Sequence, residues 1–304
     1  MPTSPTINPH RLATAAVVVG VDGSAASDLA VEWAADAASR HNRRLNIVHG
    51  FDLAASAELV GMYDVLVPAV TDELHRHGVD LLATAGRLAY RVDPTLDVET
   101  EVAEANPARL LIQRSETAHL VALGAAGSGA AIGYLGSTLL AVTSHGKGSI
   151  VVVREPGTEQ HTPSVGPVVV GLDGTRHSEP AVAAAFAEAS ERRTQLVAVH
   201  AWGDMFDRIS GVPYPVPDKD AQIAGQALIA EQLAGWQEKF PDVQVIRKVY
   251  LFGPRQALTD WSKSAQLVVV GSRGRGGFRG LLLGSTSNSL VQQAHCPVMV
   301  VHSK

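Results

Sequence analysis

Short, unbroken apolar runs recur along the chain, separated by longer segments whose apolar positions follow a helical period. Such runs are typical of strands in a parallel sheet, which are buried on both faces. They predict strands at 14–21, 45–49, 96–102, 120–124 and 150–153, and again at 168–172, 196–201, 243–249, 267–270 and 298–301. Each half of the chain is therefore expected to contain five strands.

The segments between these runs predict helices. In the first half they are expected at 24–40, at 71–90, from Pro107 and after the strand at 120–124; in the second half at 180–193, 221–240, from Pro254 and over 285–293. Ser24 is expected to cap the first helix, with Leu29, Trp33 and Ala37 on its buried face. Alternating strands and helices predict an α/β fold with parallel sheets and right-handed crossovers.

The two halves repeat one another in sequence. Val17–Ser24 returns as Val168–Thr175, and Gly136–Thr138 returns as Gly284–Thr286. A repeat of this length indicates a duplicated domain, because solenoid units span only about 20–50 residues. We therefore expect a disordered tail over 1–13, domains at 14–154 and 167–304, and a Pro- and Gly-containing linker at 155–166.

Composition narrows the function classes. The chain is 46% hydrophobic and 18% charged with a net charge of −5, which gives no electrostatic reason to expect nucleic-acid binding. No apolar run approaches the 18 or more residues that a membrane helix needs, and the first residues do not resemble a signal peptide. The single cysteine, Cys296, forms no internal disulfide and is expected in the core. A cytoplasmic protein is expected.

Two strand ends in each half carry distinctive chemistry. Asp22 and Asp173 follow the first strand, and glycine loops follow the fourth. In an open parallel sheet, ligands bind beyond the carboxyl ends of the strands, where the strand order reverses. Glycines and a helix N-terminus favour phosphate, whereas a carboxylate accepts hydrogen bonds from ribose or adenine. The backbone after His49 and His200 is expected to meet the adenine edge.

These loops differ from two common phosphate-binding motifs. Gly-x4-Gly-Lys-Ser/Thr is absent, since Gly146-Lys147 has no glycine at position 141. The dinucleotide fingerprint opens the first strand–helix turn, where this chain has only Gly20-Val-Asp-Gly23.

The sequence instead resembles the universal stress protein family in its tandem form. The family's ATP-binding pattern, Gly-x2-Gly-x9-Gly-Ser/Thr, is met by Gly271, Gly274, Gly284 and Ser285. The pattern Val-Gly-x-Asp-x-Ser/Thr occurs at 19–24 and 170–175, and residues 295–301 are similar to the family's closing strand.

The resemblance implies two Rossmann-like, five-stranded parallel sheets of strand order 3-2-1-4-5 with helices on both faces. It also implies ATP between strands 1 and 4, with or without Mg²⁺, and a stress-response role through a regulatory protein partner. The closing strands of two such domains commonly pair, so an internal pseudo-dimer is expected, and a homodimer through the same edges stays open. The nucleotide-binding residues so assigned are Asp173, Ala201, Gly271, Gly274, Arg275, Gly284, Ser285 and Thr286, with Asp22, Gly50, Gly124, Gly127, Gly136, Ser137 and Thr138 in the first domain.

The first domain departs from the pattern. Eight residues separate Gly127 from Gly136, where nine separate Gly274 from Gly284. Its loop also lacks the arginines of the second loop, Arg273, Arg275 and Arg279. We expect weaker nucleotide binding there, or none.

Plainer roles compete with these assignments. Asp22 and Asp173 could serve only as helix caps, the loop arginines could be solvated surface charges, and the two strand-end histidines are expected to form local hydrogen bonds rather than bind metal. Trp202 is the tryptophan best placed for a ligand contact. No catalytic constellation is evident, so the leading hypothesis is an ATP-binding regulatory protein. The alternatives are a slow ATPase or nucleotidyl transferase, and an interaction module without nucleotide.

Overall fold

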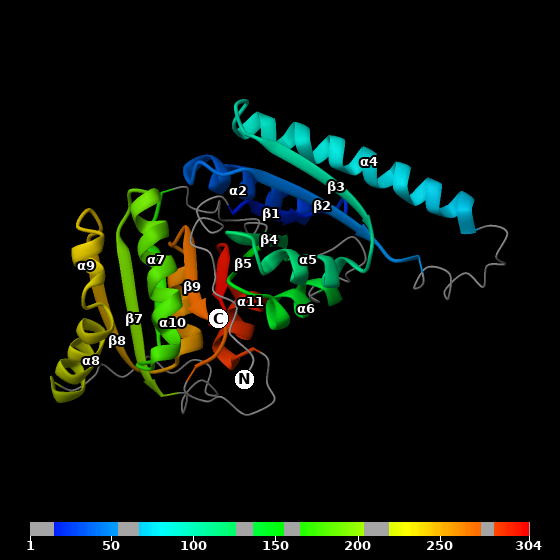
Figure 1. Ribbon diagram of the computed structural model, residues 1–304. Helices are drawn as coiled ribbons and strands as arrows, with labels where there is room; N and C mark the ends of the chain where they lie inside the picture. The colour runs from blue at the N-terminus through cyan, green and yellow to red at the C-terminus, as the bar shows by residue number, and fades with distance from the viewer. Residues whose placement is uncertain are drawn as a thin grey trace, which may run out of the picture. The chain divides into compact units, whose positions relative to one another are not determined.

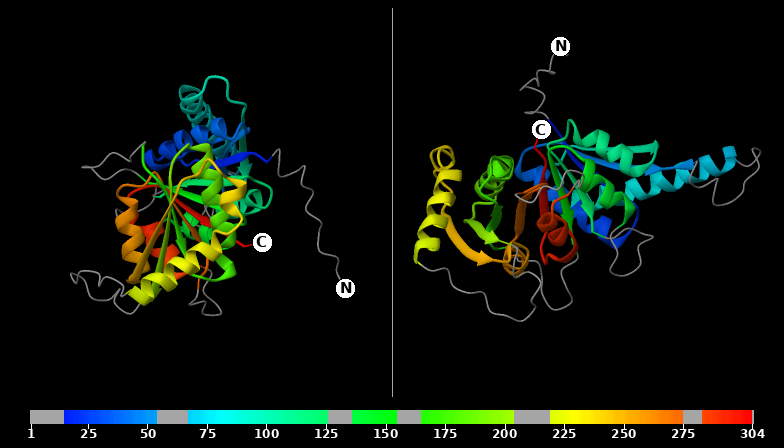
Figure 2. Two further views of the ribbon diagram at one scale, coloured as in Figure 1. Left: turned by 90° about the vertical axis from the view of Figure 1, so that its left-hand side faces the viewer. Right: turned by 90° about the horizontal axis from the view of Figure 1, so that it is seen from below.

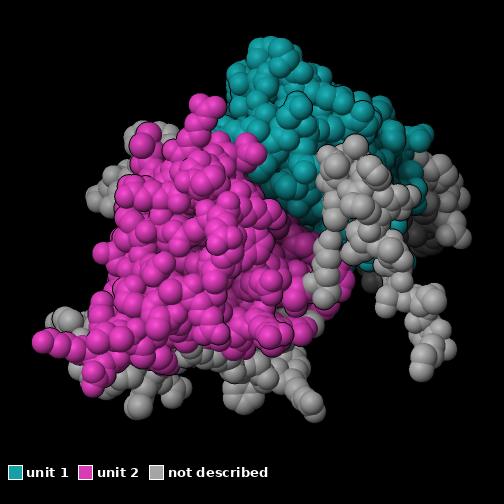
Figure 3. All heavy atoms as spheres, turned by 60° about the vertical axis from the view of Figure 1, so that its left-hand side comes forward, with its two compact units in different colours: residues 1–142 teal, residues 143–304 magenta. Residues whose placement is uncertain are grey.

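The computed structural model describes residues 15–53, 67–125, 136–154, 165–203, 219–274 and 283–303. The chain divides into two compact units, residues 1–142 and 143–304, which Figure 3 colours separately. The predicted tail, most of the linker, Gly127, Arg275 and Arg279 lie outside the described residues. No helix in the described ranges has both the length and the apolar character needed to cross a bilayer.

The first unit contains a parallel sheet of order β3-β2-β1-β4. Its strands are β1 (Val17–Gly20), β2 (Leu45–Phe51), β3 (Val98–Glu104) and β4 (Leu120–Gly124). The connecting helices are α2 (Ala25–Arg40), α4 (Val67–Val92) and α5 (Pro107–Ser115), labelled in Figure 1. The helix α6 (Ser137–His145) follows β4.

Capping explains where α2 begins. The Ser24 hydroxyl accepts a hydrogen bond from the Ser27 amide, as predicted. The predicted buried face is confirmed at Ala37 but wrong at Leu29 and Trp33, which are only half-buried. The buried positions are mostly alanines, including Ala30, Ala34 and Ala38. Small side chains at these positions let the helix lie close to the sheet.

The second unit contains six strands in the order β5-β10-β9-β6-β7-β8. They are β5 (Ser149–Val153), β6 (Val168–Leu172), β7 (Leu196–Gly203), β8 (Val245–Phe252), β9 (Leu267–Gly271) and β10 (Val298–Val301). Strands β6 to β10 have the predicted order 3-2-1-4-5. The closing strand of the first repeat, β5, pairs antiparallel with β10, which confirms the expected pairing of the closing strands.

Helices cover both faces of this sheet, as Figure 2 shows. The short 3₁₀ helix η1 (Arg176–Ser178) leads into α7 (Glu179–Glu191), which lies on one face with α8 (Lys219–Gln232). The helices α10 (Pro254–Ser262) and α11 (Ser285–Gln293) lie on the other face. The predicted class, a doubly wound α/β fold, is confirmed.

One helix predicted in the second half is broken. Residues 221–240 were expected to be continuous, but α8 ends at Gln232 and a separate short helix, α9 (Trp236–Lys239), follows. Gly235 between them has φ of +79°, a left-handed conformation that ends a helix and that glycine adopts readily.

Burial is deepest in the sheet of the second unit. Every residue of β10 is buried, and Cys296 just before it is fully buried. Burial raises the pKa of the Cys296 thiol to about 12, so the thiol stays protonated at neutral pH. Cys296 is thus the core residue that the sequence predicted.

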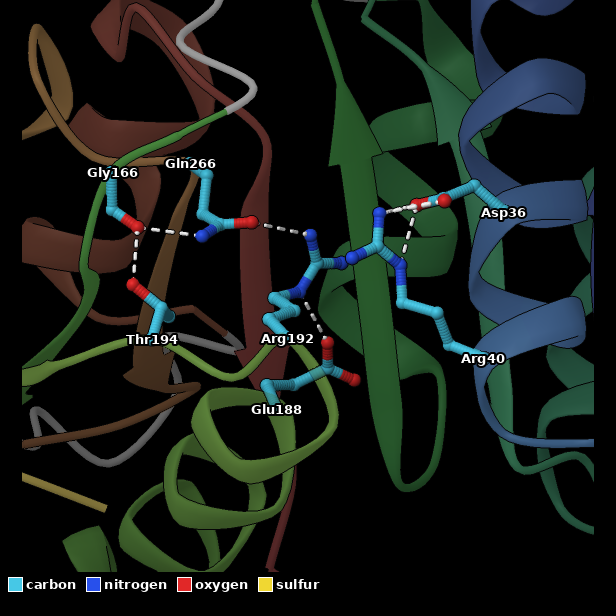
Figure 4. A network of polar contacts seen from close by, with 7 residues as sticks. All are labelled: Asp36, Arg40, Gly166, Glu188, Arg192, Thr194 and Gln266. Atoms are coloured by element: carbon cyan, nitrogen blue, oxygen red, sulfur yellow. Dashed lines mark hydrogen bonds and ion pairs between the residues drawn. The ribbon is translucent and has the colours of Figure 1, made fainter. Parts of the chain in front are cut away.

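A buried polar network fixes the start of the second repeat (Figure 4). The Arg192 Nε donates to Glu188 at 2.9 Å, and its Nη1 donates to Gln266 Oε1 at 3.1 Å. Gln266 and Thr194 both donate to the carbonyl of Gly166. The Glu188 and Arg192 side chains are only 4% and 5% exposed, so each charge depends on the other.

Replacing Glu188 with Ala should destabilise the protein by about 3 kcal/mol, because Arg192 would remain buried without its counter-ion. Asp36→Ala is the matched control, since Asp36 and Arg40 form an ion pair of the same spacing that is more than one third exposed. That change should cost less than about 0.5 kcal/mol. Chemical denaturation measures both; equal losses would contradict the argument.

Candidate functional site

The site lies where the strand order of the second unit reverses. Strand β6 pairs with β7 on one side and with β9 on the other, and all three are parallel. Asp173 directly follows β6, and Gly271 ends β9. The carboxylate and the glycine loop therefore lie at the same edge of the sheet, as the switch-point argument predicted.

A cavity of about 490 Å³ opens between these two strand ends. Its lining comes from the ends of β6, β7 and β9 and from the first turns of α10 and α11. The lining residues are Gly171, Leu172, Asp173, Ser178, Val199, Ala201, Trp202, Gly203, Pro254, Leu258, Val270, Gly271, Arg273, Gly274, Leu283, Gly284, Ser285, Thr286 and Ser287. All the described residues predicted for the second domain are among them.

Asp173 uses one carboxylate oxygen to build the turn after β6. Its Oδ1 accepts hydrogen bonds from the Thr175 amide at 2.8 Å and from the hydroxyls of Thr175 and Ser178. Thr175 in turn caps η1. The Oδ2 atom also accepts from the Thr175 hydroxyl and lies toward Gly274, where a Cβ would be 3.4 Å away. The helix cap is therefore Thr175 rather than Asp173, and Asp173 supports the turn before the cap mainly through Oδ1.

Hydrogen bonds join the two described ends of the glycine loop, residues 271–274 and 283–287. The Gly284 amide donates to the Ser272 carbonyl at 2.7 Å, and the Ser287 hydroxyl donates to the Gly271 carbonyl at 2.8 Å. Helix α11 begins after Gly284 with no side-chain cap, whereas Ser24 and Asn106 cap α2 and α5. The first amides of α11 have no partner within the helix and carry its positive dipole end. This end of the cavity is suited to an anion.

The opposite end of the cavity is formed by β7 and α10. The Gly253 amide donates to the Gly203 carbonyl at 2.9 Å, and α10 also starts without a side-chain cap. Trp202 lies edge-on to His200, with ring centroids 5.0 Å apart. His200 is buried, and its Nδ1 lies 2.9 Å from the Leu172 carbonyl. His49 contacts the Val21 carbonyl in the same way, so both histidines form the local hydrogen bonds that were expected.

The corresponding region of the first repeat is more tightly packed. A Cβ on Gly124 would lie 2.6 Å from the backbone of Ala26, whereas one on Gly271 would be 3.5 Å from the equivalent His177 carbonyl. A Cβ on Gly50 would lie 2.9 Å from the Ala105 carbonyl oxygen. Its counterpart, Ala201, carries a Cβ and still lines the cavity.

Polar side chains occupy further positions in the first repeat. Asn106, the counterpart of Gly253, caps α5 by accepting from the amides of Ala108 and Arg109 and also donates to Asp52 at 3.3 Å. Asp22 accepts from the Ser24 amide and hydroxyl, much as Asp173 does from Thr175. Gly136, Ser137 and Thr138 start α6, and a Cβ on Gly136 would have no neighbour within 4 Å.

Sequence reasoning missed several residues of the cavity, among them Leu258, Pro254 and Ser178. A signal for Leu258 existed: Gly20 and Gly171 recur in the repeat, and each leaves room for a leucine, Leu111 or Leu258. In the described residues no three His, Cys, Asp or Glu side chains gather in a way that could hold a metal ion.

Comparisons with known proteins agree with the duplicated fold. The model of the universal stress protein family matches residues 15–154 and 165–302. A universal stress protein of Mycolicibacterium smegmatis is 40% identical over 291 residues, covering 95% of this chain and 97% of the relative. Another, from Mycobacterium tuberculosis, is 38% identical over 290 residues, covering 93% and 96%.

A solved structure shows the same fold at lower identity. The crystal structure of a universal stress protein from Archaeoglobus fulgidus has a TM-score of 0.65 and 19% identity, covering 94% of this chain and 98% of that one. With two family matches spanning almost the whole chain and close relatives of equal length, this protein belongs to the universal stress protein family and contains two tandem domains of it.

Proposed function

We propose that the second domain binds ATP in the cavity between β6 and β9, and that the protein acts as a nucleotide-dependent regulator in a stress response. One observation carries this proposal: a carboxylate and an uncapped helix start both line the same cavity. A simple anion would be repelled by Asp173. A nucleotide offers hydroxyls and a base to one side and phosphates to the other.

The cavity also matches a nucleotide in size and in its backbone edges. Its volume of about 490 Å³ falls in the range of small-ligand pockets, roughly 300–1,000 Å³. The pairing of β6 with β7 ends at Leu172 and His200, whereas β7 runs on to Gly203. The backbone of Ala201 and Trp202 thus extends past its neighbour and supplies hydrogen-bonding groups for an adenine edge.

In this proposal Gly271, Gly274, Gly284, Ser285 and Thr286 bind the phosphates, with Arg273 beside them. Ser285 and Arg273 are exposed, so both are accessible to a ligand. The first domain binds nucleotide weakly or not at all, because Gly50 and Gly124 are packed against neighbouring backbone and Asn106 already caps α5.

Gly284→Glu should weaken ATP binding by about 100-fold or more, since a carboxylate would stand where the phosphates bind. The substitution is compatible with folding, because a Cβ there meets only Ser272 and Ser287 atoms at 3.4 Å. Gly136→Glu in the first repeat is the matched control and should leave most binding intact. Calorimetry measures affinity, and thermal unfolding checks the fold.

Wild-type protein that binds no adenine nucleotide would overturn the proposal and favour an interaction module. A hydrolysis assay on the same samples separates a sensor from an enzyme, since ATP turnover well above background would indicate an ATPase.

Asp173→Asn should weaken ATP binding by about tenfold, because Oδ2 would be replaced by an amide that donates where the carboxylate accepts. The retained oxygen can still accept from Thr175 and Ser178, so the turn should survive. Asp22→Asn makes the same change in the first repeat and should have little effect. Equal effects of the two variants in calorimetry would place nucleotide in both domains.

A further inference from the structure

A chain of backbone hydrogen bonds links the start of α11 to the turn between α6 and β5. The Gly284 amide donates to Ser272 at 2.7 Å, and the Ser272 amide donates to Val301 at 2.8 Å. The next residue, His302, donates from its amide to Gly148 at 2.8 Å. The first bond joins the start of α11 to the end of β9; the other two cross from β9 to β10 and from β10 to β5, and neighbouring strands are about 4.8 Å apart. The α6–β5 turn thus lies roughly 10 Å from the glycine loop.

The turn between α6 and β5 exposes two basic side chains to solvent. His145 and Lys147 are exposed, while Gly146 between them is buried. Gly148 has φ of +64°, a left-handed conformation that fixes the turn and suits glycine. The turn belongs to the first family match by sequence, yet residues 143–304 form one compact unit that also contains the cavity.

The basic side chains of the turn and Arg273 of the glycine loop are all close enough to His302 to influence its imidazole. Burial, helped by the charges of Lys147, Arg273 and His145 and opposed by a hydrogen bond with Thr143, lowers the pKa of His302 to about 4. His302 is therefore neutral at pH 7, and the lasting positive charge near it comes from Lys147 and Arg273. Arg273 itself lines the cavity. Lys147 and His145 do not line the cavity themselves, and the backbone hydrogen bonds place their turn roughly 10 Å from the ends of its glycine loop.

We propose that Lys147, a residue of the first repeat, neutralises the terminal phosphate of a nucleotide bound in the second domain. The first repeat then makes this site selective for nucleoside polyphosphates over monophosphates. The glycine loop and α11 are close to Asp173 and bind the first phosphate, whereas Lys147 lies farther along the same edge of the sheet. This inference rests on the proposed nucleotide site.

The test measures the affinities of ATP, ADP and AMP for full-length wild type and for Lys147→Ala, Lys147→Arg and Lys263→Ala by calorimetry. Lys147→Ala should weaken ATP binding by about tenfold and leave AMP binding within about twofold. Lys147→Arg should retain most ATP affinity. Lys263 is an exposed lysine at the end of α10, paired with Asp260, and its replacement removes the same charge away from the site.

The outcomes separate the two proposals. If the wild type binds ATP and Lys147→Ala binds all three nucleotides with unchanged affinity, only the role of Lys147 is overturned. An equal loss of affinity for AMP and ATP in Lys147→Ala would also overturn only that role. An equal loss of ATP affinity in Lys263→Ala would mean that the change in net charge alone causes the loss in Lys147→Ala. That result would overturn the role of Lys147 too. Wild type that binds none of the nucleotides would overturn the site itself.

Discussion

The adjacency of β6 and β9 is the constraint on which the site depends. Because the chain leaves β6 toward one face of the sheet and β9 toward the other, no helix covers the edge between their carboxyl ends. Asp173 and the Gly271 loop meet there although almost one hundred residues separate them in sequence. Gly171 permits β6 to lie under Leu258 of α10, where a Cβ would be 2.9 Å from that side chain. The cavity thus follows from the winding of the sheet and from one small residue in it.

The two repeats show how the same winding can be kept while the packing at several strand ends changes. Strand order, the strand-end histidines and the turn-forming aspartates are alike in both. Three positions at the strand ends and helix starts differ between the repeats. Gly50 of the first repeat corresponds to Ala201 of the second, Asn106 to Gly253, and Ala26 to His177. Each alters how closely a helix start approaches a strand end. The Asn106 side chain caps α5, whereas its counterpart α10 starts at Gly253 without a side-chain cap, so the first turn of α5 has fewer free backbone amides to offer a ligand.

Much of this fold is predictable because its strands are unbroken apolar runs and its strongest motifs are local. Strands β4, β6 and β10 and helix α11 occur at the predicted residues, and Pro107 and Pro254 begin helices. Packing distances are not written in a single sequence, so the closure around Gly50 could not be predicted, and the recurrence of Gly20 as Gly171 could not by itself show that Leu258 packs there. The break between α8 and α9 was not predicted from Gly235, because a glycine within a helical pattern is often tolerated. Only the left-handed backbone conformation of Gly235 shows that the helix is interrupted there.

The antiparallel pairing of β5 with β10 has a consequence for dissecting the protein. Val298–Val301 is buried between β5 and β9. In the sequence, β5 precedes the linker, whereas the other five strands of the second unit follow it. A fragment that starts after residue 164 would expose the hydrogen-bonding edge of an entirely apolar strand, which invites self-association. The smallest soluble piece with the second cavity therefore includes the end of the first repeat. The boundary of the folding unit and the boundary of the duplicated sequence are different places in this chain.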